Sequence, residues 1–155
     1  MSVIKDYQPR IGVRYHQKGL QEFGGQAKGV AHFKYDFSLD GGAVGIIVLS
    51  VNSGLPANAI IKDFILNPII AVTSGGATTL AWGMTAGGSA TCFLAATGKA
   101  SFTADAIVQG IPTEGTVSSY VKLSASGSIQ LTVGVSPITA GLIEGWAEFV
   151  VAANP

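Results

Sequence analysis

Residues 120–151 read YVKLSASGSIQLTVGVSPITAGLIEGWAEFVV, and this stretch decides the fold class. Apolar and polar residues alternate through 120–125 and again through 129–135, and residues 142–151 run as a last strand, with turn residues between the segments. Successive side chains of a strand point to opposite faces, so the pattern predicts three strands, each with one buried face. Because short turns join them, we expect neighbouring strands to pair in antiparallel fashion. The predicted buried face of the middle strand comprises Ile129, Leu131, Val133 and Val135.

The first half of the chain shows similar segments. Within residues 32–37, three aromatic residues (Phe33, Tyr35 and Phe37) alternate with His32, Lys34 and Asp36, which predicts another half-buried strand. Residues 44–51 are nearly all apolar, which is typical of a strand buried on both faces. Residues 59–66 predict a further strand; Asn67-Pro68 interrupts it, and residues 69–72 continue it past a bulge.

The middle of the chain is less regular. Residues 78–85 predict a strand with Leu80, Trp82 and Met84 on one face. Residues 90–96 predict a short strand or an irregular segment, and residues 102–109 predict one helical turn capped by Thr103. We therefore expect an all-β protein, an antiparallel β-sandwich or jelly roll of about eight strands.

Composition and charge divide the chain into two parts. Only 12% of its 155 residues are charged, against roughly 25% in typical soluble domains, so we expect much of the surface to contact other protein. Residues 1–35 carry six cationic and two acidic side chains, a net charge of +4, whereas the remainder carries −4. Residues 1–30 are glycine-rich with no sustained period, which predicts an extended N-terminal arm before a sandwich domain at 31–155.

The sequence offers little catalytic chemistry. His16 and His32 have no cysteine or acidic partner at metal-ligand spacing. Glu144 and Glu148 share a strand face roughly 13 Å apart, beyond the roughly 5–9.5 Å of glycosidase carboxylates. Trp146 lies between them, where it could stack on a sugar or be covered by a neighbouring subunit or the arm. We expect no enzyme activity, no cofactor and no metal site.

The cysteine content and the lengths of the apolar runs predict the cellular compartment of the protein. A lone Cys92 cannot form an intrachain disulfide, and its apolar surroundings predict burial. Neither a signal peptide nor an apolar run of roughly 18 residues is present, so we expect synthesis in the cytoplasm and no membrane partner. The basic residues are scattered, so we expect no nucleic-acid partner.

Seven segments, in this order, carry a family resemblance over roughly the last two-thirds of the chain. They are AIIKDFIL (59–66), TLAWGM (79–84), FLAAT (93–97), IVQGIP (107–112), VKLSA (121–125), IQLTV (129–133) and TAGLIEGWAEFVV (139–151). This strand-and-turn texture resembles the small jelly-roll capsid decoration, or cement, proteins of tailed bacteriophages. Residues 1–35 lie outside the resemblance.

The resemblance implies a structural virion protein that binds the major capsid protein on the outer capsid surface and stabilises the shell. Alternatives are a head-fibre or tail-associated virion protein and a carbohydrate-binding β-sandwich that uses Trp82 or Trp146; a small hydrolase has the least support. The low charge also predicts a homo-oligomer, a dimer or trimer. The residues predicted to contact a partner are Tyr7, Arg10, Arg14, Tyr15, Phe23 and Trp146.

Overall fold

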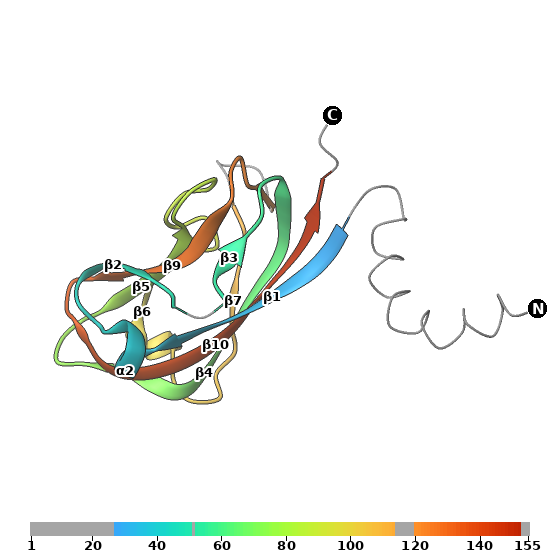
Figure 1. Cartoon of the computed structure of the whole chain (residues 1–155). Coiled ribbons are helices and arrows are strands. Elements are labelled where there is room, and N and C mark those ends of the chain that lie inside the picture. The colour runs from blue at the N-terminus through green and yellow to red at the C-terminus, as the bar shows by residue number, and fades with distance from the viewer. Residues whose placement is uncertain (1–26, 51, 114–119, 153–155) are drawn as a thin grey trace, which may run out of the picture.

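The computed structural model describes residues 27–50, 52–113 and 120–152, which fold into two antiparallel sheets packed face to face (Figure 1). The strands of the described part are β1 (Ala27–Asp36), β2 (Gly45–Val48), β3 (Gly54–Leu55), β4 (Ala59–Ser74), β5 (Thr79–Met84), β6 (Leu94–Gly98), β7 (Val108–Gly110), β8 (Val121–Lys122), β9 (Gly127–Gly134) and β10 (Ile138–Val151). Two helical turns, α2 (Phe37–Asp40) and η1 (Lys99–Ser101), accompany them. The predicted all-β sandwich is therefore confirmed, with ten strands in these residues in place of about eight.

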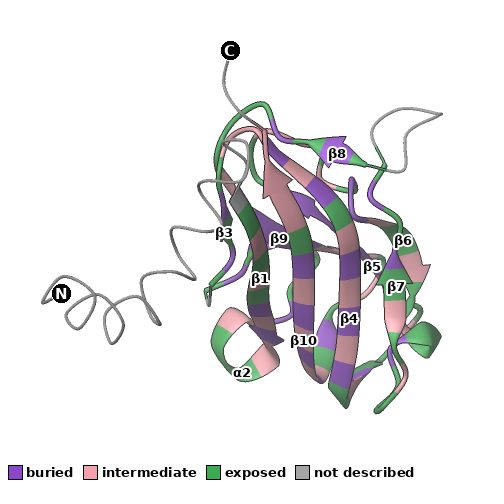
Figure 2. Ribbon diagram, turned by 90° about the vertical axis from the view of Figure 1, so that its right-hand side faces the viewer, coloured by how far each residue is buried: buried purple, intermediate pink, exposed green. Residues whose placement is uncertain are grey.

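The two sheets have different strand orders. The first sheet runs β1-β10-β4-β7, with β8 also paired to β4. The second runs β2-β9-β5-β6, with β3 also paired to β9. Figure 2 shows buried and more exposed residues alternating along the strands of the first sheet, as expected for a sheet with one face on the core.

The three strands predicted for residues 120–151 exist, but they do not pair with one another. β8 pairs with β4, β9 lies between β2 and β5, and β10 lies between β1 and β4. The expectation of antiparallel neighbours within this stretch is therefore wrong. After β9 the chain passes through Val135, which has a left-handed φ of 71° and an exposed side chain, and crosses to the other sheet. Ile129, Leu131 and Val133 are buried as predicted, whereas Val135 is not.

A proline-centred bulge lies within β4, as predicted. Residues 59–74 form one strand that pairs with β10 along most of its length. Pro68 lies opposite Ile143, and the register shifts before Ile70 pairs with Leu142. Proline has no N–H to donate, so a break in the ladder at Pro68 leaves no N–H of this residue without an acceptor.

Two local predictions are wrong. Residues 44–51 do not form a strand buried on both faces, because β2 is an edge strand on which Ile46 and Val48 are exposed. The one helical turn expected within 102–109, capped by Thr103, is not helical: the chain makes a tight turn closed by a bond from the Ala106 N–H to the Thr103 carbonyl (3.1 Å). Asp105 has a left-handed φ of 63°, which a continuing helix cannot accommodate.

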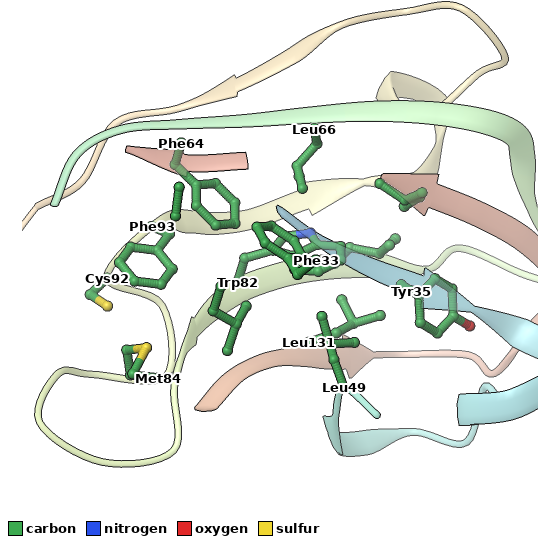
Figure 3. Close-up of a cluster of buried hydrophobic side chains, with 14 of the residues drawn as sticks. Phe33, Tyr35, Leu49, Phe64, Leu66, Trp82, Met84, Cys92, Phe93 and Leu131 are labelled. Atoms are coloured by element: carbon green, nitrogen blue, oxygen red, sulfur yellow. The ribbon is translucent and has the colours of Figure 1, made fainter. Parts of the chain in front are cut away.

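Aromatic side chains fill the space between the two sheets (Figure 3). Phe64 stacks on Phe93 with ring centroids 4.8 Å apart and on Phe33 at 5.3 Å. Trp82 lies 5.9 Å from Phe33 and is fully buried. Aromatic pairs of this kind contribute about 0.5–1.5 kcal/mol each beyond the burial of their area. Cys92 lies at one end of the same core and is 2% exposed, so its predicted burial is confirmed.

Candidate functional site

The outer face of the first sheet presents an aromatic stack at its centre. Trp146 points outward because its neighbours on β10, Gly145 and Ala147, are buried on the inner face. In the sheet register Trp146 lies opposite His32 on β1 and Ile65 on β4. The imidazole of His32 stacks on the indole, with ring centroids 5.1 Å apart and planes inclined by 16°.

Charged side chains surround this stack in complementary pairs. The two pairs nearest the aromatic rings are His32 Nε2 with Glu144 Oε1 (3.8 Å) and Lys34 Nζ with Asp36 Oδ2 (3.4 Å). Farther along the sheet, the pairs are Lys62 Nζ with Glu148 Oε1 (3.7 Å) and the amide of Gln109 with Asp63 Oδ1 (3.1 Å). Exposed pairs contribute at most about 1 kcal/mol each, so they add little to folding stability. The Lys34–Asp36 and Lys62–Glu148 pairs can be covered by another surface without burying either ion unpaired, whereas Lys28 on β1 has no ion-pair partner among the described residues.

Asp36 closes one end of this face through a local network. Its Oδ1 accepts hydrogen bonds from the backbone N–H (3.0 Å) and the hydroxyl (2.6 Å) of Ser38, so Asp36 caps the N-terminus of α2. These bonds, followed by Lys34, hold the pKa of the Asp36 carboxyl below its ordinary value. On the inner face next to it, burial raises the pKa of Tyr35 above its ordinary value, and its hydroxyl donates to the Gly41 carbonyl (2.7 Å).

A second candidate surface follows the edge strand of the second sheet. Val44, Ile46 and Val48 point to one side, and their exposed fractions are 54%, 63% and 52%. Three large apolar side chains in a row on an edge strand suit a protein contact, because charge or coverage is the usual protection of such edges. The sequence did not reveal this surface, because an uninterrupted apolar run also fits a strand buried on both faces.

The structure places some predicted contact residues and leaves others outside its described part. Trp146 lies on the outer face with Glu144 and Glu148 on either side along β10, as predicted. Tyr7, Arg10, Arg14, Tyr15 and Phe23 lie outside the described residues. Trp82 is 0% exposed, so it cannot be the stacking platform of a sugar site.

Metal-binding clusters and membrane-spanning helices are both absent from the described part of the chain. In residues 27–50, 52–113 and 120–152, no three His, Cys, Asp or Glu side chains are grouped so that they could hold a metal ion. No helix of these residues has the length and apolar character needed to cross a bilayer.

No protein-family model matches this sequence, and no curated protein matches it. The fold does match chains in three solved bacteriophage structures. The acidic stable capsid of Helicobacter pylori bacteriophage KHP30 gives 11% identity and a TM-score of 0.55 over 81% of this chain and 89% of that chain. The capsid asymmetric unit of cyanophage Pam1 gives 17% identity and a TM-score of 0.56 over 82% of this chain and 86% of that chain. The capsid of Ralstonia phage GP4 gives 22% identity and a TM-score of 0.54 over 84% of this chain and 87% of that chain. At these identities the likeness shows a shared fold. Each match covers more than four-fifths of both chains, so the matched chains are of similar length to this one.

Proposed function

We propose that this protein is a structural virion component, a capsid decoration or cement protein that binds the outer surface of the major capsid protein and stabilises the shell. The observation that carries the proposal is the nearly whole-chain match to chains of similar length in three phage capsid structures. A short chain matched over more than four-fifths of its length is what a separate decoration subunit would give. A domain within a larger shell protein would instead leave most of that protein unmatched.

The surface of the sandwich supports the same role. A cement protein has to cover its neighbours over a broad area with few unpaired charges buried in the contact. The outer face of the first sheet offers the stack of Trp146 and His32, with the ion pairs Lys34–Asp36 and Lys62–Glu148 around it. Buried tryptophans are frequent anchors of protein interfaces, so Trp146 is the residue we expect to contribute most to capsid affinity.

The N-terminal arm contributes a second set of contacts in this proposal. The predicted anchors are Tyr7, Tyr15 and Phe23, with Arg10 and Arg14 pairing with carboxylates of the capsid or of a neighbouring subunit. Fixing such a segment costs about 1–2 kcal/mol per residue in backbone entropy, so a partner surface has to repay that cost. The first described strand begins at Ala27, so removal of residues 1–26 leaves every described strand intact.

Binding to capsids that lack the protein tests the proposal. Purified protein is mixed with such capsids, co-sedimented and located by cryo-electron microscopy. We expect saturable binding with density on the outer shell, a loss of at least tenfold in affinity for Trp146→Ala, and weaker binding after deletion of residues 1–26. Tyr120→Ala is the control, since Tyr120 is an aromatic residue that is 54% exposed and takes no part in the stack of Trp146 and His32. Absence of the protein from the particle would refute the proposal.

Two outcomes would correct the finer assignment. Density at a head fibre or on the tail would keep the virion role and change the location. A sugar-binding role rests on a specific feature, the outward indole of Trp146 between Glu144 and Glu148. Its test is a glycan array, in which binding that disappears in Trp146→Ala would favour the carbohydrate alternative.

A further inference from the structure

The free edge of β1 carries backbone groups that no described residue uses. β1 pairs with β10 on one side, and the described part of the chain places no strand on its other side. The N–H of Asp36 donates to Oδ2 of Asp40 (3.0 Å) instead of to β10. On the far side of β10, the N–H of Ala152 donates to the carbonyl of Asn58 (3.0 Å), which is consistent with the same alternation. Along an antiparallel strand, successive residues point their backbone N–H and C=O groups to opposite sides. Residues 28, 30, 32 and 34 therefore point these groups at the free edge, as Asp36 does.

An open hollow lies along the same edge, between the two sheets. Its volume is about 610 Å³. The residues that line it come from β1, from β10 and from the segment at the start of β3: Val30, Ala31, His32, Phe149, Asn52 and Gly54. A Cβ on Gly54 would meet nothing within 4 Å. A strand added to β1 would therefore direct every second side chain into this space.

The charges beside the edge favour an acidic occupant. The side chains of Lys28, Val30, His32 and Lys34 lie on the outer face next to the free edge. Lys28 is exposed and has no ion-pair partner within the described residues, whereas Lys34 pairs with Asp36 (3.4 Å) and lies opposite Glu144 in the register with β10. Opposite charges directly across a strand pair stabilise it. Carboxylates facing positions 28 and 34 would therefore complement this edge.

A second copy of β1 fits the edge poorly. Two β1 strands related by a two-fold axis use all four free residues when position 28 of one copy faces position 34 of the other. That register sets Lys28 against Lys34 twice, and like charges directly opposite are destabilising. A register shifted by one pair brings Lys28 to Asp36, whose N–H is already donated to Asp40.

We propose that the free edge of β1 binds an extended acidic segment of a partner protein as an additional strand. The segment would place carboxylates opposite Lys28 and Lys34 and small apolar side chains in the hollow beside Ala31 and Phe149. Its backbone would pair with residues 28, 30, 32 and 34, which is the strand-addition mode of peptide recognition. The chemistry of the edge defines this partner whether or not the protein is part of a capsid.

Amide hydrogen exchange on the isolated full-length protein tests whether the edge is open. We expect fast exchange at Val30, His32 and Lys34 and slow exchange at the alternate residues Gly29, Ala31 and Phe33. Slow exchange at Val30 and His32 at low protein concentration would mean that the chain covers its own edge. Protection that rises with concentration would mean pairing between copies, and either result would overturn the proposal.

A peptide titration tests the occupant and leaves the capsid out of the measurement. The probe is a capped nine-residue peptide of alternating glutamate and valine, added to ¹⁵N-labelled protein. We expect chemical-shift changes at residues 28–34 and 52–54, and at least tenfold weaker binding of the same peptide with lysine for glutamate. No shifts at millimolar peptide, or equal binding of the lysine peptide, would overturn the proposal.

Two variants test whether the peptide binds at the free edge of β1. Val30→Pro removes one N–H that faces the free edge and none that faces β10, and Gly54→Trp places a bulky side chain on a residue that lines the hollow. Each is expected to weaken peptide binding at least tenfold. Gly98→Trp is the control for Gly54→Trp, because both glycines lie in strands with open space where a side chain would start. Unchanged binding by both Val30→Pro and Gly54→Trp would show that the peptide binds elsewhere.

Discussion

The aromatic ring of Phe33 on β1 covers Gly145 on β10, its partner in the sheet register. A Cβ at position 145 would stand 2.1 Å from Cζ of Phe33, well inside van der Waals contact. The reverse arrangement occurs four residues along β1, where the ring of Phe149 on β10 covers Gly29. Each glycine thus makes room for a ring from the other strand, and a slip of one residue would place both rings against side chains.

Gly145→Ala is therefore expected to destabilise the sandwich. The added methyl group has to push the Phe33 ring out of a fully buried position in the core, and overpacking of this kind costs about 1–3 kcal/mol. Chemical denaturation followed by tryptophan fluorescence measures the change. Gly98→Ala, with nothing within 4 Å of the new Cβ, is the control and should be nearly neutral. Equal stability of the two variants would contradict the packing described for Phe33.

The alternation of residues predicted which side chains face the core but not which strands lie side by side. Phe33, Leu80 and Leu131 could be assigned to the inner face because the period of a strand is local. The pairing of β9 with β2 and β5 depends on contacts between distant parts of the chain, so the short turns between β8, β9 and β10 suggested the wrong neighbours. The exposure of β2 depends on its place at a sheet edge, which an apolar run does not reveal.

The candidate site was predictable to a similar extent. The alternation of β10 places Trp146 and the two glutamates on one outer face, and the structure agrees. The stack of His32 on Trp146 joins residues far apart in the sequence, and its prediction needs the register of β1 against β10. That register depends on packing between strands, including the glycine and phenylalanine pairs, rather than on any local pattern.

Neighbouring residues on β2 provide a sharp test of its edge position. Ile47 is 9% exposed and Ile46 is 63% exposed. Ile47→Ala should cost about 2–5 kcal/mol of unfolding free energy, as large-to-small changes in cores do. Ile46→Ala should lower the unfolding free energy far less, because most of the Ile46 side chain is already exposed to water in the folded protein. Similar losses for both variants would mean that β2 is buried on both faces.

The same edge strand predicts the behaviour of the protein in solution. We expect the protein to form a dimer or trimer, and the exposed row of Val44, Ile46 and Val48 is a contact surface suited to it. Ile46→Lys should lower the mass measured by light scattering at micromolar concentration without unfolding the chain. A monomeric wild-type protein would contradict the expected oligomer, and an unchanged oligomer in Ile46→Lys would place the contact elsewhere.

Cys92 is expected to be protected from reagents and replaceable. Its side chain is 2% exposed and lies in the core next to Met84 and Phe93 (Figure 3). Thiol reagents should label the native protein slowly and the unfolded protein at once. Cys92→Ser should lose about 1–3 kcal/mol, because it places a hydroxyl in apolar surroundings, while partner binding is retained. Rapid labelling under native conditions would contradict the packing of this region.

Asp36 is expected to make part of the stability depend on acid pH. Its folded pKa is lowered from the ordinary value of 3.8, first by the hydroxyl and backbone N–H of Ser38 and then by Lys34. A lowered pKa means that folding favours the carboxylate. The stability it contributes is therefore complete above the unfolded pKa and is lost as pH falls through the folded pKa. Asp36→Ala removes that contribution, so the variant should be less stable than the wild type at pH 7.

The difference in unfolding free energy between the wild type and Asp36→Ala should stay constant from pH 7 to about 5 and shrink below the ordinary pKa of 3.8. Other carboxylates affect both proteins alike and cancel in this difference. Asp36→Asn is the matched control, because its side-chain oxygen can still accept the bond from the Ser38 N–H that caps α2 but cannot ionise. The difference between Asp36→Asn and Asp36→Ala should therefore not change with pH over this range. A wild-type advantage over Asp36→Ala that persists undiminished at pH 2 would show that the carboxylate charge does not contribute to the cap.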